Sequence, residues 1–502
     1  MVHVRTVRTS SGATAVQIVH SNHYGKRDIE HIGSAHTPAE VELLKVVARQ
    51  RLSAGQGEFD LGLDTTPVGP KPQIVGSRAA LLWGAISRAY AALGLADACG
   101  GDDVFFGLVA ARIIEPTSKL DSLRVIEEVG IKPPSYPTIN RRLPVYATDE
   151  FRGGISAALS KSAKIGPASL VLYDVTTLYF ETDKADDLRV PGFSKERRLE
   201  PQIVVGLLAD ASGFPLEVTA FEGNKAETLT MLPVIRRFMK AHRLTDVTVV
   251  ADAGMVSDAN KKALEAEGLS FIIGERVPKM PYAVQSWKDA HPGEEFADGQ
   301  VFTQPWPAGP TDGRRDHAIY YQYRADRARR TLRGIDEQIK KAQAAIGGKA
   351  AIKRNRFVTI TGGKRSLNTE LEAKARAIAG IKGYITNRLD LTAEQTIAAY
   401  HQLWHVEKAF RMSKHDLRAR PIYHRTKESI DAHLTVVIAA MAVAHFIETE
   451  TGWSIKKFVR AARRYRTIDI EIAGHTMPLD QKPPDDLATA LTAITAAATN
   501  GH

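Results

Sequence analysis

The sequence predicts an α/β protein whose mixed β-sheet is flanked by helices and preceded by a β-hairpin and a mainly helical region. Residues 1–35 alternate between apolar and polar side chains as strands do, and residues 77–165 have the apolar pattern of helices. From residue 169 onward, apolar runs and helical segments follow in the order strand, hairpin, helix, strand, helix, strand. This order describes a mixed sheet with helices on its faces.

The N-terminal region begins with two alternating runs, residues 2–8 and 15–20, separated by the turn-forming sequence Ser-Ser-Gly. A β-hairpin fits this pattern. The period becomes helical after Thr37, a residue type that caps helix N-termini. A Pro/Gly-rich stretch at residues 66–72 is then expected to be a linker.

The helical region contains a candidate DNA-contacting helix. It starts near Pro137 and carries the adjacent residues Arg141 and Arg142, as a recognition helix lying on DNA does. Helix packing without DNA contact is the alternative. The other helices are expected at residues 79–95, 102–114 and 118–129.

The predicted sheet is interrupted once. Residues 279–379 are irregular and basic, so an insertion is expected before a last core strand returns at residues 383–387. The chain of 502 residues is too long for one hydrophobic core. The predicted domains are an N-terminal DNA-binding region (1–165), a catalytic core (166–278 and 380–450), an insertion domain (279–379) and a C-terminal tail (451–502).

Composition narrows the class of protein. The formal net charge of +10 favours polyanionic partners such as nucleic acids. Cys99 is the single cysteine, which excludes a disulfide framework and a zinc site built on several thiolates. The N-terminus lacks the apolar run of a signal peptide, and the most apolar segment, residues 433–446, is interpreted as a buried helix. A cytoplasmic protein without a membrane segment is expected.

Two acidic residues end apolar strands of the predicted sheet. Asp174 follows residues 169–173, and Asp252 follows residues 247–251, which places the acids 252 − 174 = 78 residues apart. Taken singly, each could cap a turn or start a helix. Phosphodiester chemistry, however, uses two divalent ions about 4 Å apart, and hard ions such as Mg²⁺ require carboxylate oxygens. Two strand-end acids in one sheet therefore indicate a metal site.

A third acid lies on the helix predicted for residues 393–414. Tyr400, Glu407 and Lys414 are spaced seven residues apart, so they are expected to share one face of a continuous helix. A solvated charged face is the alternative. Because Trp404 and Phe410 border the same stripe, burial beside a site is favoured.

These stretches resemble bacterial insertion-sequence transposases of the DDE superfamily, which have an RNase H-like core. The group most similar to this chain carries the signature Y-x₂-R-x₃-E-x₆-K on its third-acid helix. Four stretches match, namely residues 172–181, 192–202, 250–255 and 400–414, and the resemblance covers roughly residues 170–450. The signature arginine is replaced by Leu403, and Arg411 is a candidate substitute.

The resemblance implies a set of roles. Asp174, Asp252 and Glu407 would bind two Mg²⁺ ions, for which Mn²⁺ can substitute, and Tyr400 and Lys414 would contact DNA near the scissile phosphate. The insertion at residues 279–379 would help bind the transposon end. Basic residues close to the first acid are further candidates for phosphate binding, with a solvated charge run as the alternative, namely Lys195, Arg197 and Arg198.

The function implied is DNA transposition by metal-dependent cleavage at transposon ends and transfer of the freed 3′-hydroxyl to target DNA. The expected partner is double-stranded DNA, both terminal inverted repeats and target. A homodimer would hold the two ends together, in the bacterial cytoplasm at the nucleoid. Three alternatives stay open: an inert DNA-binding relative, an RNase H-like nuclease without strand transfer, and a tyrosine recombinase.

Overall fold

The computed structural model shows two compact units, each assembled from segments far apart in the sequence. The first contains residues 1–85, 127–132 and 456–492, and the second contains residues 86–126, 133–455 and 493–502. The sequence instead suggested an N-terminal region, a catalytic core interrupted by one insertion domain, and a C-terminal tail, and these boundaries stay predictions. The structure describes residues 2–9, 12–21, 27–53, 73–166, 168–181, 184–192, 200–348, 355–361, 364–420, 422, 424, 426–472 and 475–500.

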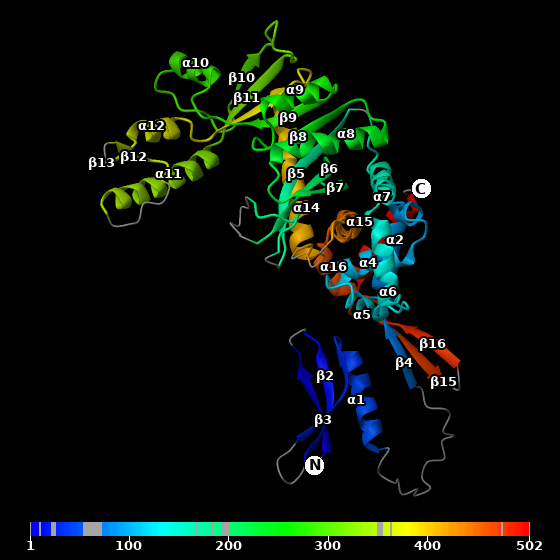
Figure 1. Ribbon diagram of the computed structural model, residues 1–502. Coiled ribbons are helices and arrows are strands. Elements are labelled where there is room, and N and C mark those ends of the chain that lie inside the picture. The colour runs from blue at the N-terminus through cyan, green and yellow to red at the C-terminus, as the bar shows by residue number, and fades with distance from the viewer. Residues whose placement is uncertain are drawn as a thin grey trace, which may run out of the picture. The chain divides into compact units, whose positions relative to one another are not determined.

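An antiparallel sheet of β1 (Val2–Arg8), β2 (Thr14–Ser21) and β3 (Arg27–Ala35) opens the first unit. It confirms the predicted hairpin and adds a third strand that was not predicted. Helix α1 (Pro38–Ser53) packs on this sheet, where Val16, Ile18 and Ala48 form a small core (Figure 1). Thr37 caps the helix, since its Oγ1 accepts a hydrogen bond of 3.3 Å from the Glu40 amide. The predicted linker at residues 66–72 lies outside the described residues.

A second sheet of the first unit joins residues from both ends of the chain. Strand β4 (Gln73–Arg78) pairs with β15 (Thr467–Ile472), which pairs with β16 (His475–Asp480), all antiparallel. Arg78 and Asp469 form an ion pair across this sheet, and Arg463 donates to Glu128 at 2.7 Å. The C-terminal segment therefore completes a structure that begins near residue 73. Two helices flank its strands in the sequence, α16 (Ile455–Ala462) and α17 (Asp485–Asn500).

The region predicted to be helical is helical. Its elements are α2 (Ala80–Ala92), α3 (Leu95–Ala98), α4 (Asp103–Ile114), α5 (Ser122–Glu128), α6 (Tyr136–Ala147) and α7 (Asp149–Ser162). Helices α4, α6 and α7 contact the long helix α15 (Lys427–Thr451). By length and composition α15 could cross a membrane, but 89% of its most apolar window is buried inside the structure. It extends well beyond the predicted 433–446 and is buried, as predicted.

The core sheet of the second unit has eight strands within the described residues, in the order β10-β11-β14-β9-β8-β5-β6-β7. Five of them, taken in chain order, are β5 (Ser169–Tyr179), β6 (Gln202–Asp210), β7 (Pro215–Glu222), β8 (Val247–Ala251) and β9 (Ser270–Glu275). The first three are antiparallel, whereas β8 and β9 run parallel to β5. Helix α8 (Met231–His242) precedes β8, and α9 (Asp258–Ala266) precedes β9. The order third-second-first-fourth-fifth is that of an RNase H-like core, which confirms the predicted fold.

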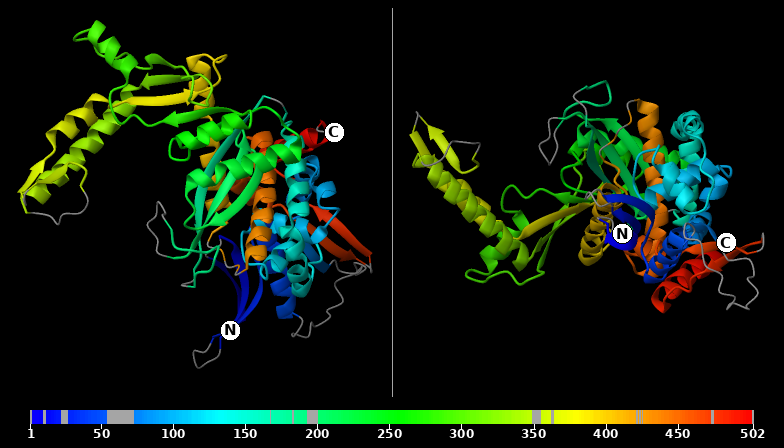
Figure 2. Two further views of the ribbon diagram at one scale, coloured as in Figure 1. Left: turned by 45° about the horizontal axis from the view of Figure 1, so that its top comes forward. Right: turned by 90° about the horizontal axis from the view of Figure 1, so that it is seen from below.

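The sheet continues into the stretch predicted to be an insertion. Strand β9 pairs with β14 (Ile381–Thr386), β14 with β11 (His317–Tyr323), and β11 with β10 (Val301–Trp306), each antiparallel. The remainder surrounds a core of its own around Ile335 and Phe357, with α11 and the β12–β13 hairpin side by side (Figures 1 and 2). Its elements are α11 (Ala325–Ile346), β12 (Val358–Thr361), β13 (Lys364–Leu367) and α12 (Thr369–Ala377), whereas α10 (Tyr282–Ala290) contacts β10.

The helix predicted for residues 393–414 is not continuous, so that prediction is wrong. It consists of α13 (Ala393–His401), α14 (Leu403–Arg411) and a π-helical turn, η2 (Met412–Asp416). Around Gln402 the backbone tightens, because the Gln402 amide bonds to the Ala399 carbonyl and the His405 amide bonds to the Gln402 carbonyl. Spacing of seven residues therefore no longer fixes one shared face. A short turn, η1 (Glu227–Leu229), precedes α8.

Candidate active site

Two of the three predicted catalytic acids lie at the same edge of the core sheet. Strands β5 and β8 are parallel neighbours, and Leu172 pairs with Val250. Asp174 and Asp252 each lie two residues beyond this pair in the sequence, so both acids lie at the same edge of the sheet. Asp174 is half-buried, since β5 continues beyond it, whereas Asp252 directly follows the last residue of β8 and is exposed.

Asp252 is held by the tyrosine of the third-acid segment. The Tyr400 hydroxyl donates a hydrogen bond of 2.6 Å to Asp252 Oδ1. Tyr400 reaches this position over Gly274 on β9, where an added Cβ would lie 2.7 Å from the tyrosine oxygen. The Lys382 ammonium on β14 donates to the same oxygen at 3.0 Å and lies 4.2 Å from the centre of the ring. An ammonium only donates, so the phenol proton is directed toward Asp252.

Burial and charge reinforce this arrangement. Burial, together with the bond to Asp252, raises the pKa of Tyr400 above its ordinary value. The phenol therefore stays protonated and remains a donor. Burial lowers the pKa of Lys382, while the charges of Asp252 and Glu407 oppose that shift. Lys382 and Tyr400 are thus both electrostatically coupled to two of the candidate acids.

Glu407 comes to this edge on helix α14, which packs against β5. It is exposed. Lys414, in the π-helical turn, donates a hydrogen bond to the hydroxyl of Thr176, two residues beyond Asp174 on β5. The segment from Tyr400 to Lys414 therefore contacts the sheet beside both aspartates, with Glu407 between its two contacts.

The carboxylates do not form a closed ligand set. Among the described residues, no three His, Cys, Asp or Glu side chains are close enough together to hold a metal ion. The donor chemistry nevertheless fits a hard divalent cation, because carboxylate oxygens are the ligands that Mg²⁺ prefers. One acid lies on β5, another directly follows β8, and the third lies on a helix packed against β5.

Other predicted features of the third-acid segment differ from expectation. Trp404 is 55% exposed, so the prediction that it borders a buried site is wrong, whereas Phe410 is buried. The predicted helix breaks at Gln402, two residues before Trp404. Arg411 is exposed on α14. The basic residues predicted near the first acid lie outside the described residues, namely Lys195, Arg197 and Arg198.

The two arginines of the candidate DNA-contacting helix, α6, have different surroundings. Arg142 donates at 3.0 Å to Asp102, which also accepts from the Tyr146 hydroxyl at 3.0 Å and from two backbone amides at the start of α4. Arg142 is thus part of a structural cluster that joins α6 to α4. Arg141 is exposed, and its guanidinium donates a hydrogen bond of 3.3 Å to the Thr138 hydroxyl on the same helix.

Sequence reasoning missed several residues at the site. Lys382 immediately precedes the predicted last strand at residues 383–387, and a lysine entering an apolar strand was the available signal. Gly274 ends the predicted strand 270–274, where it resembled an ordinary strand terminus. A group of arginines in the predicted insertion also lies close to the site, namely Arg324, Arg327 and Arg330.

Comparisons with known proteins identify one family. Residues 165–443, more than half of the chain, match the family described as "Transposase DDE domain". Curated protein sequences give no match. Among solved structures the chain is similar to a piggyBac transposase in a synaptic complex with hairpin DNA, at 11% identity over 83% of this chain and 74% of that chain. The TM-score of 0.36 is too low for this likeness to support any assignment.

Proposed function

Because this chain belongs to the family of transposases with a DDE domain, we propose that it cuts DNA at the ends of a mobile element and joins the freed 3′-hydroxyl to target DNA. One observation carries the proposal. Asp174 on β5 and Asp252 directly after β8 lie at the same edge of two neighbouring parallel strands, and the helix with Glu407 packs against β5.

Asp174, Asp252 and Glu407 are the residues that would hold two Mg²⁺ ions, with Mn²⁺ as a substitute. When bound, such ions activate the attacking hydroxyl and stabilise the departing oxygen. Tyr400 orients Asp252 through its 2.6 Å hydrogen bond, and Lys414 fixes the end of the segment against β5. These contacts limit the freedom of the acids before DNA arrives, which lowers the cost of organising the site.

The substrate in this proposal is double-stranded DNA, first the terminal inverted repeats and then the target. The net charge of +10 supports it, since cations that neutralise phosphates release counterions and add affinity. Arg141, exposed on α6, is a candidate contact, as is Arg411 on α14. Two ends must be held together for joining, so a homodimer on DNA, at the bacterial nucleoid, is part of the proposal.

A second candidate is an inert relative that binds DNA without cutting it. Two observations favour it. Leu403 stands where the family signature has arginine, and no three acidic or histidine side chains among the described residues form a ready metal site. Both candidates bind DNA, so cleavage alone separates them.

The decisive experiment compares Asp252→Asn with the wild-type chain in Mg²⁺ on a plasmid that carries the element's ends. We expect cleavage and joined products from the wild type and neither from the variant, with DNA binding retained. Asp258→Asn is the matched control, because Asp258 is 92% exposed at the start of α9 and pairs with Lys261. It should cut like the wild type.

Other outcomes identify the rivals. A variant that still cuts would remove Asp252 from the site. Wild-type protein that binds ends but never cuts would be the inert relative, and breaks without joined products would indicate a simple nuclease. A DNA–tyrosine adduct trapped during cleavage would assign the reaction to a different chemistry altogether.

A further inference from the structure

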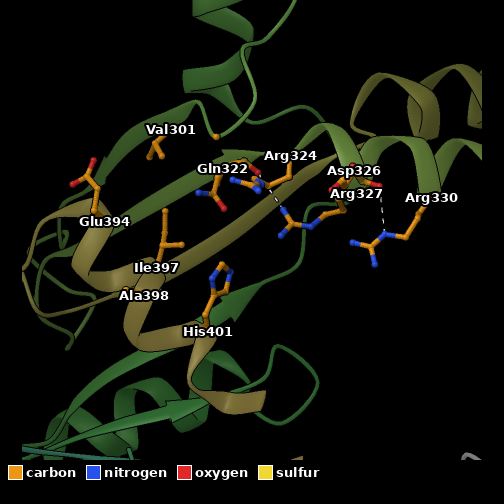
Figure 3. Close-up of a pocket in the computed structure, with 11 residues that line it drawn as sticks. Val301, Gln322, Arg324, Asp326, Arg327, Arg330, Glu394, Ile397, Ala398 and His401 are labelled. Carbon is orange, nitrogen blue, oxygen red and sulfur yellow. Dashed lines mark hydrogen bonds between the residues drawn. The ribbon is translucent and has the colours of Figure 1, made fainter. Parts of the chain in front are cut away.

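A cavity of about 500 Å³ lies beside the candidate active site, between α11 and α13. Its walls come from β10 and β11, which extend the core sheet and are called the sheet extension below, from the start of α11, and from one face of α13. Figure 3 shows Arg324 and Arg327 on one side of this space, and Ile397 and His401 from α13 on the other. His401 directly follows Tyr400, whose hydroxyl bonds to Asp252, so one wall of the cavity belongs to the helix that also contacts a candidate catalytic acid.

Three arginines line the cavity, and one of them, Arg324, pairs with Asp298 at 3.6 Å. Within the described part of the chain, neither Arg327 nor Arg330 lies within ion-pairing distance of a carboxylate, and Arg327 is held by two long hydrogen bonds of 3.4 Å to carbonyl oxygens. Of the two acids that line the cavity, Asp326 pairs with Arg329, outside the lining. Glu394 is the other. The side chains that line the cavity therefore carry a net positive charge, which favours an anionic ligand.

The arginines form a row along α11. Arg330 also lines a second cavity, of about 420 Å³, to which Arg356 contributes. From Arg324 to Arg330 the helix rises about 9 Å, at about 1.5 Å per residue. Successive nucleotides of one DNA strand advance about 3.4 Å along the axis, so the row is long enough for two or three phosphates. A chain of phosphates therefore fits this row better than a single small anion.

The family signature has a cation on the third-acid helix at the position that is Leu403 in this chain. Leu403 cannot contact phosphate, and Arg411, the substitute suggested by the sequence, is exposed on α14 with no described contact to Tyr400. The cation nearest the Tyr400 hydroxyl is instead Lys382, on β14, at 3.0 Å. Arg327 lies close enough to contribute to lowering the pKa of Lys382, after the larger effect of burial.

We propose that Arg324, Arg327 and Arg330 bind consecutive phosphates of the DNA strand next to the catalytic acids, and so supply the contact that Leu403 lacks. This inference rests on the proposed function, because it takes DNA as the substrate. It deepens that function by assigning the strand-holding contact to α11 and the sheet extension rather than to the third-acid helix.

The test measures how DNA affinity depends on salt, with a fluorescein-labelled duplex of mixed sequence as the probe. Each lost phosphate contact should reduce the slope of log K against log salt by about 0.9 and weaken binding about fivefold at ~0.15 M salt. We expect this of Arg330→Gln, whose side chain is exposed, and of Arg327→Gln. Arg327→Lys keeps the charge and should keep the slope. Arg333→Gln is the matched control, an exposed arginine on the same helix outside both cavities.

The possible outcomes distinguish failure of the phosphate-binding row from failure of the proposed function. If Arg330→Gln and Arg327→Gln keep the wild-type slope while the wild type binds and cuts DNA, the phosphate row is refuted and the proposed function stands. If the wild type neither binds nor cuts, both fall. If inorganic phosphate at matched ionic strength competes with the duplex in the wild type and no longer in Arg330→Gln, the site takes a free anion instead of a strand. Retained Mn²⁺ binding in all variants would show that the acids are undisturbed.

Discussion

Two aspartates in the second unit accept a hydrogen bond from a tyrosine hydroxyl, yet their surroundings differ. Asp102 accepts a hydrogen bond of 3.0 Å from the Tyr146 hydroxyl, and Asp252 accepts one of 2.6 Å from the Tyr400 hydroxyl. Asp102 is 9% exposed and also accepts from Arg142 and two backbone amides. Asp252 is exposed at the end of a strand. The same pair of residue types is a structural clamp in one place and an orienting contact in the other.

The difference follows from how far each carboxylate is buried. An ionised carboxylate has about four lone-pair sites, and Asp102 has donors from a guanidinium, a hydroxyl and two amides around it. These donors, among them the Arg142 guanidinium, occupy the acceptor sites that a metal ion would need. At Asp252 solvent reaches the carboxylate, and the tyrosine fixes its direction. Exposure therefore distinguishes a ligand from a clamp better than residue type does.

Asp102→Ala should have the largest effect of the changes that test this comparison. It removes the N-cap of α4 and leaves Arg142 and the buried Tyr146 hydroxyl without their acceptor. We expect a loss of about 3 kcal/mol in the free energy of unfolding. Urea titration followed by circular dichroism measures it. Mn²⁺ binding by the folded protein should be unchanged, and a loss there instead would reverse the assignment of the two aspartates.

Tyr400→Phe should have the second-largest effect. It should lower the affinity for metal rather than the stability of the fold. The ring remains, and Asp252 loses the donor that orients it. A tenfold to hundredfold loss in Mn²⁺ affinity is expected, about the usual cost of removing a residue that orients a metal ligand. Electron paramagnetic resonance of free Mn²⁺ gives the affinity directly. Unchanged affinity with reduced stability would make Tyr400 a clamp like Tyr146.

Gly274→Ala should produce a smaller loss of the same kind, about tenfold. The new methyl group would lie 2.7 Å from the Tyr400 oxygen and 3.2 Å from the Ala253 amide, so the phenol must move. In the Tyr400→Phe background the same change should cost less, since the displaced oxygen is absent. Equal costs in both backgrounds would show that the methyl group acts through the strand and not through the hydroxyl.

The smallest effects are expected from the arginines of α6. Arg142→Ala should lower stability by about 1 kcal/mol, because the side chain is 44% exposed and its partner keeps three other donors. Arg141→Ala should leave stability within about 0.5 kcal/mol. If α6 contacts DNA, only Arg141→Ala should weaken binding at unchanged stability. Fluorescence anisotropy of labelled DNA measures binding. Weaker binding by Arg142→Ala alone would contradict the assignment of Arg141 to DNA and Arg142 to the structural cluster.

Local signals allowed much of the site to be predicted. Asp174 and Asp252 each end an apolar run, and such a run places a polar residue at the edge of a sheet whatever its neighbours are. The helical region and the hairpin at residues 202–221 were likewise found from their periods and turn residues. These features depend on residues close together in the chain.

Features that depend on pairing between distant segments were missed. The sequence shows that Lys382 precedes an apolar strand, but it does not show that Lys382 contacts Tyr400. That contact depends on the position of β14, which is set by its pairing with β9. The break at Gln402 has no proline or glycine to mark it. The Asp102 cluster joins residues 40 and 44 positions apart, so Arg142 resembled a free basic residue.

The pairing of β4 with β15 has a consequence for biosynthesis. Arg78 and Asp469, which meet across these strands, are 391 residues apart. At roughly 5–20 residues per second, a ribosome needs about 20–80 s to make the intervening polypeptide. Throughout that interval β4 presents an open backbone edge, which is a template for association with other chains. A message cut short before codon 467 would leave the edge open permanently, so its product should be prone to aggregate even though the whole RNase H-like sheet has already been translated.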